Sequence, residues 1–94
     1  LVVAIATVPE LYEKIASNIL EVKSRGASTL VITQDLDGNF KDSADEVIGI
    51  PEVDSSFAAL VSVVPAQLFA YYCAIQRGND PDKPRNLAKS VTVE

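Results

Sequence analysis

Histidine, tryptophan and methionine are absent from this 94-residue sequence, and cysteine occurs once, as Cys73. Without histidine the chain lacks the commonest general base and metal ligand, and no other residues have the spacing of a metal site, so we expect no metal. A single cysteine excludes an intramolecular disulfide, and its apolar surroundings predict a buried structural thiol. With no secretory or transit signal apparent either, we expect a reducing, cytoplasmic setting.

Positive charge is also scarce, with 8 Lys and Arg against 13 Asp and Glu and a net charge of −5. Because nucleic-acid phosphates require concentrated Lys and Arg, a chain without a basic cluster is not expected to bind nucleic acid. No glycine-rich phosphate loop occurs. The run Asp35–Gly38 has the Asp-x-Asp spacing of haloacid dehalogenase phosphatases, but their other motifs are missing. An ordinary polar loop after a strand is therefore the favoured interpretation.

Three short segments rich in β-branched residues have the pattern of β-strands. They are Leu1–Ala6, Thr29–Thr33 and Glu46–Ile50. The first is an uninterrupted apolar run, typical of a strand covered on both faces in a parallel sheet. The sequence predicts an α/β fold in three αβα layers, with three parallel strands in sequential order as part of a doubly wound sheet.

Two helices are expected to accompany these strands, at about Val8–Arg25 and Ser56–Arg77. Apolar residues recur at helical spacing in the first. Thr7 and Glu10 have the spacing of a capping box at its start, and Gly26 suits the left-handed position after its end. For the second helix, Asp54, Ser55 or Ser56 is the expected cap.

The second predicted helix is the most apolar part of the chain, and its length alone would permit a membrane span. Pro65 and Gln67 fall in mid-span, however, and the rest of the sequence is patterned as a soluble α/β domain. We therefore expect no membrane partner. A stripe of small residues beside a bulky stripe predicts packing on both sides, against the sheet and against a neighbouring element.

The last segment, Asn79–Glu94, is an irregular tail without helical periodicity. Pro81 and Pro84 restrict its backbone and lower the entropy cost of ordering it. If the end of the tail is extended, Lys89 shares a face with three apolar residues. They are Leu87, Val91 and Val93. These features predict a tail with a specific role, distinct from a domain that spans residues 1–78.

The run Asp82–Glu94, with its PRNLAKSVTVE ending, resembles the carboxyl-terminal end of the glutamine:fructose-6-phosphate aminotransferase family, also called glucosamine-6-phosphate synthases. Further segments are similar to the same family in the same order. They are Glu10–Lys14, Ser17–Ile19, Ile50–Val53, Pro65–Leu68 and Ala70–Tyr71. The resemblance covers essentially all 94 residues but only the end of a much longer enzyme, the later part of its second SIS (sugar isomerase) domain. It implies a fragment of the isomerase half, with an SIS-like, flavodoxin-like fold.

The resemblance assigns catalysis to Lys89, which in this family handles the open-chain sugar phosphate and forms an imine at its C2 carbonyl. Ala88, beside it, is expected to contact the substrate. No pyridoxal phosphate or other cofactor is implied, because the imine forms with the substrate itself. The family's phosphate-binding loop, proton-transferring glutamate and ring-opening histidine match no position here. Glu52 is the nearest carboxylate to a plausible site edge, but no motif makes it catalytic.

Two functions follow from this reading. In the first, the parent enzyme makes glucosamine 6-phosphate from fructose 6-phosphate and glutamine, the first step of hexosamine biosynthesis, and acts as a homodimer; these 94 residues alone are then expected to be inactive. In the second, the chain is a non-catalytic SIS-type module for sugar-phosphate binding or protein interaction. The PRNLAKSVTVE tail favours the first, because a pure binding module does not need a lysine there.

Overall fold

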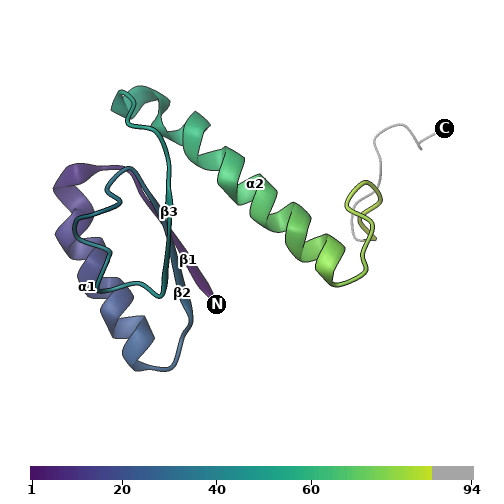
Figure 1. The fold of residues 1–94 in the computed structure, drawn as a ribbon, viewed down its shortest axis with the longest axis horizontal. Coiled ribbons are helices and arrows are strands. Elements are labelled where there is room, and N and C mark those ends of the chain that lie inside the picture. Colours follow the sequence, from purple (N-terminus) through teal and green to yellow (C-terminus); the bar gives the residue numbers. More distant parts are fainter. Residues whose placement is uncertain (86–94) are drawn as a thin grey trace.

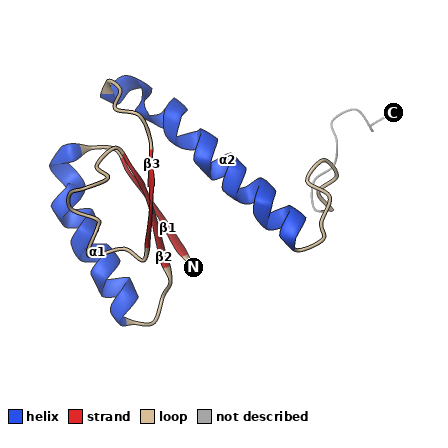
Figure 2. Ribbon diagram, in the orientation of Figure 1, coloured by secondary structure: helices blue, strands red, loops and turns tan. Residues whose placement is uncertain are grey.

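The computed structural model describes residues 1–85, in which a three-stranded sheet lies between two helices (Figure 1). Strands β1 (Val2–Ala6), β2 (Thr29–Thr33) and β3 (Glu46–Gly49) are all parallel and lie in the order β1-β2-β3. Helix α1 (Tyr12–Ser24) covers one side of the sheet, and α2 (Ala58–Gln76) begins on the other side and extends away from it (Figure 2). The predicted α/β fold with sequential parallel strands is confirmed.

The core lies between α1 and the sheet. Strand β2 is central and all five of its residues are buried, so its side chains are covered on both faces. On the α1 side, Val31 is fully buried and packs in one cluster with Ala6 and Ile19. On the opposite face Ile32 is also fully buried. Because side chains alternate along a strand, the adjacent residues Val31 and Ile32 point to opposite faces of the sheet.

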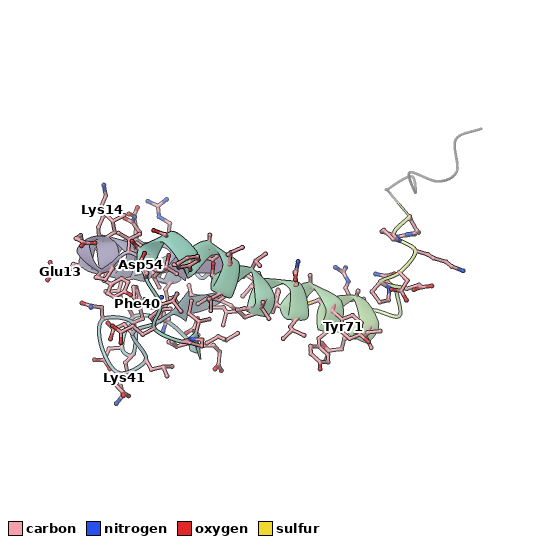
Figure 3. The ribbon with its side chains drawn as sticks, turned by 90° about the horizontal axis from the view of Figure 1, so that it is seen from above. Glu13, Lys14, Phe40, Lys41, Asp54 and Tyr71 are labelled. Carbon is pink, nitrogen blue, oxygen red and sulfur yellow. The ribbon has the colours of Figure 1, made fainter. Side chains whose placement is uncertain are left out.

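The loop between β2 and β3 also contributes to the core, although its sequence is mostly polar. Phe40 is fully buried, and its ring packs edge-on against Tyr12 with centroids 5.4 Å apart. Figure 3 shows Phe40 among the side chains gathered at the sheet end of the molecule. The sequence predicted only a polar loop here, because one aromatic residue among Asp, Gly and Ser has no periodicity.

The starts of the helices differ from the predictions. A short 3₁₀ turn, Pro9–Leu11, precedes α1, and its N-cap is Val8, without a side-chain hydrogen bond. The predicted capping box of Thr7 and Glu10 is therefore wrong: Pro9 occupies the first position of the 3₁₀ turn, which moves the cap one residue past Thr7. A second 3₁₀ turn, Ser55–Phe57, precedes α2.

The edge strand β1 is less covered than its sequence predicted. Ala6 is fully buried, but Val3 and Ile5 are 40% and 50% exposed. These two alternate with Ala4 and Ala6, so one face of β1 packs on α1 while the other is open in the described part of the chain. The prediction that the first strand is covered on both faces is therefore wrong for β1; among the described residues, β2 is the strand with both faces covered. The strand β3 ends at Gly49 and not at Ile50, because Pro51 follows directly.

Helix α2 makes little contact with the rest of residues 1–85. Only Ala58 and Ser62, at its start, are buried. Most of its large apolar side chains are exposed: Leu60, Val63, Val64, Leu68, Tyr71, Tyr72 and Ile75. The predicted packing on both sides is therefore wrong for the described residues. The helix leaves the sheet after its first turns, and Figure 3 shows Tyr71 far from the sheet.

The segment Ser55–Gln76 is apolar and long enough to cross a membrane, with a mean hydropathy of 1.7 in its most apolar window. The segment meets the criteria for a membrane span by its length and composition only, and core helices of soluble proteins meet the same criteria. Cys73, in the same helix, is only partly buried, so the predicted buried thiol is wrong. Its position past the first turns of α2 takes it away from the sheet.

Candidate functional site

The two residues that the sequence assigns to the site, Lys89 and Ala88, lie outside the described residues 1–85. What the structure describes is the path of the chain toward them. That path consists of the end of α2, the turn that follows it, and the first part of the tail up to Arg85.

Helix α2 ends in a left-handed cap at Gly78, which has a φ of 74°. The Gly78 N–H donates to the carbonyl of Ile75 at 3.0 Å, and the Asn79 N–H donates to the carbonyl of Ala74 at 2.9 Å. These two bonds form a Schellman motif, which satisfies carbonyls that the helix end would otherwise leave unpaired. The cap fixes the direction in which the tail leaves α2.

A second turn follows immediately in the tail. The Asp80 carboxylate accepts a hydrogen bond from the Asp82 N–H at 2.9 Å, and the Lys83 N–H donates to the Asp80 carbonyl at 3.2 Å. Pro81 occupies the position of this turn that its fixed φ suits. The turn folds the tail back beside the last turns of α2, leaving an open hollow lined by residues of both. They are Ala70, Ala74, Gly78, Asn79, Asp80, Pro81, Lys83, Pro84 and Arg85.

The carboxyl ends of the parallel strands meet at the edge of the sheet where α2 begins. In open α/β sheets this edge is where ligands bind. Thr33, the last residue of β2, is buried at this end of the sheet and accepts two hydrogen bonds there. Its carbonyl accepts from the Ile50 N–H at 2.9 Å, and its hydroxyl accepts from the Asp35 N–H at 3.1 Å. The side-chain nitrogen of Gln34 is buried there without a hydrogen-bond partner among the described residues. Glu52, near the same edge, is exposed.

Asp54 caps the start of the segment that leads into α2. Its carboxylate accepts a hydrogen bond from the Ser56 N–H at 2.9 Å, and this bond holds the pKa of Asp54 below its ordinary value. Of the three residues that the sequence offered as caps, the structure selects Asp54. A carboxylate at this position also interacts favourably with the positive end of the helix.

The carboxylate with the most strongly lowered pKa among the described residues lies at the opposite end of the sheet, where the strands begin. Asp45 pairs with Lys23 of α1 at 2.8 Å. Hydrogen bonding to Lys23 and then to Thr29 lowers the pKa of Asp45 from 3.8 to about 2. Because it is remote from the carboxyl ends of the strands and each of its oxygens has a partner in Lys23 or Thr29, this carboxylate has a structural role. Within residues 1–85, no group of three His, Cys, Asp or Glu side chains could hold a metal ion.

The sheet order, the helices on either side and the tail after α2 now allow comparison with known families. The SIS domain family model matches residues 1–77. The chain belongs to the SIS domain family. The match ends within one turn of the Gly78 cap, so the SIS match covers the sheet and both helices and stops where the tail begins.

Three curated relatives illustrate how closely this SIS chain matches longer proteins. Each is named glutamine–fructose-6-phosphate aminotransferase [isomerizing]. The relative from Clostridium tetani is 49% identical over 94 residues, which are 100% of this chain and 16% of the relative. Those from Thermus thermophilus and Bacillus subtilis are 52% and 54% identical over 93 residues, 99% of this chain and 15% of each relative. The chain therefore spans less than one-fifth of the length of these proteins.

The sequence predicted the tail as part of the site but did not predict Gln34 at the carboxyl ends of the strands. The tail was identified from its prolines and from the resemblance carried by PRNLAKSVTVE. Gln34 was missed, because a single Gln after a strand has no signal in one sequence. The buried position of its amide nitrogen is a property of the tertiary structure.

Proposed function

We propose that this chain is the carboxyl-terminal part of the isomerase half of a glutamine–fructose-6-phosphate aminotransferase. The parent enzyme makes glucosamine 6-phosphate from fructose 6-phosphate and glutamine. The observation that supports this most strongly is identity of about half the residues, across the whole chain, with relatives that carry this name. Within that match, the PRNLAKSVTVE ending of the tail is the segment with the most specific resemblance.

In this proposal Lys89 is the catalytic residue. Its neutral side-chain amine attacks the C2 ketone of open-chain fructose 6-phosphate, and loss of one water molecule leaves an imine between Nζ and C2. Ala88 contacts the same substrate. Once the tail is closed onto the rest of the parent enzyme, its apolar residues favour the neutral amine by excluding water. Transfer of the imine to incoming ammonia regenerates the free lysine, so the reaction needs no separate cofactor from this part of the protein.

This role of Lys89 divides the chain into two parts with different functions. Residues 1–78 form the SIS part, and residues 79–94 form the active-site tail. The Gly78 cap and the Asp80–Lys83 turn set the direction of the tail at its base, as the hydrogen bonds at those positions support. The parent enzyme acts in the cytoplasm as a homodimer. The phosphate-binding loop, the glutamate and the histidine of the reaction come from parts of the parent outside these 94 residues, so the chain alone is inactive.

A chimeric enzyme tests the proposal. In the Bacillus subtilis relative, the 93 matched residues are replaced by those of this chain, and synthesis of glucosamine 6-phosphate is measured. We expect activity within about tenfold of the relative, since about half of the replaced residues are unchanged. Borohydride in the presence of fructose 6-phosphate should attach the sugar to Lys89, located by mass spectrometry of the digested protein.

Two lysine variants of the chimera test whether Lys89, and not another lysine of the tail, is the catalytic amine. Lys89→Arg keeps the positive charge but cannot form an imine, so it should abolish trapping and lower the rate by at least about 10³-fold. Lys83→Arg is the matched control in the same tail and should retain both. Trapping at Lys83, or an unchanged rate in Lys89→Arg, would show that Lys89 is not catalytic. A chimera that binds fructose 6-phosphate but never turns it over would favour the non-catalytic SIS module.

A further inference from the structure

We draw no further inference here: the strongest candidate, the exposed apolar surface formed by α2 and by the open face of β1, carries none, because nothing among residues 1–85 shows what covers it.

Discussion

Thr29 and Asp45 hydrogen-bond each other in both directions across the amino ends of β2 and β3. The Asp45 carboxylate accepts from the Thr29 N–H at 2.8 Å and from the Thr29 hydroxyl at 3.0 Å. In return, the Asp45 N–H donates to the Thr29 hydroxyl at 3.0 Å. Lys23 adds an ion pair from α1, so one carboxylate connects three successive elements of the fold.

We expect Asp45→Asn to lower the thermal unfolding midpoint by a few degrees at pH 7, because the amide keeps the shape but not the charge that pairs with Lys23. The pKa of Asp45 is lowered in the folded chain from 3.8 to about 2. Its contribution to stability is therefore fully present above about pH 4 and is lost as the pH falls toward 2. The gap between the natural chain and Asp45→Asn should shrink over that range, measured by circular dichroism.

The exposed Asp42 supplies the matched control for this charge change. Asp42→Asn should leave the midpoint within error at both pH values. A stability gap for Asp45→Asn that is constant from pH 7 to pH 2 would contradict an electrostatic origin. Added salt should also narrow the gap at pH 7, because the pair is only partly buried.

Phe40 is expected to be among the most sensitive positions in the chain. Phe40→Ala removes a fully buried ring from its contact with Tyr12 and should cost about 3–5 kcal/mol of unfolding free energy. Phe57 is 58% exposed, so Phe57→Ala should change stability by no more than about 0.5 kcal/mol. Urea unfolding monitored by circular dichroism compares the two. If Phe40→Ala does not fold, Phe40→Leu gives a smaller, measurable loss; equal effects at both positions would mean that the loop does not join the core.

The Gly78 cap gives a functional prediction with an internal control. Gly78 and Gly26 have φ values of 74° and 87°, and an added Cβ at either would meet no atom within 4 Å. Gly→Ala should therefore cost about 1 kcal/mol at both, because each position requires a left-handed backbone conformation that alanine adopts only with strain. In the chimeric enzyme, Gly78→Ala should lower kcat more than Gly26→Ala, because only Gly78 directs the tail that carries Lys89. Equal kcat values at equal stability would argue against that role.

The exposed apolar surface of α2 predicts how the 94 residues behave when purified alone. With so many large apolar side chains exposed, the chain should bind a hydrophobic dye and self-associate as its concentration rises. Leu68→Lys should weaken both effects, whereas Leu20→Lys adds the same charge to α1 and should weaken them less. Sedimentation velocity over a tenfold range of concentration measures association. A monomer that binds no dye would show that this surface is covered within the chain.

Local sequence patterns were sufficient for the secondary structure and the strand order. The segments around Val31 and Val47 are short and β-branched, α1 has an apolar face at helical spacing, and Gly26 follows its last turn; each of these signals comes from near neighbours. Parallel pairing follows because a helix-length connection joins β1 to β2. The resemblance to the aminotransferase family likewise came from short segments, above all the tail around Lys89.

The burial of individual residues was decided only by the tertiary structure. Val3 and Ile5 have the same sequence signature as the residues of β2, but β1 lies at the edge of the sheet, so one face is left open. Phe40 is buried because Tyr12, distant in sequence, lies above it. Asp45 is perturbed because Lys23 and Thr29 converge on it. The sequence by itself determined the elements and their order, because these depend on local propensity and periodicity; their environments depend on contacts between distant residues, which no local pattern records.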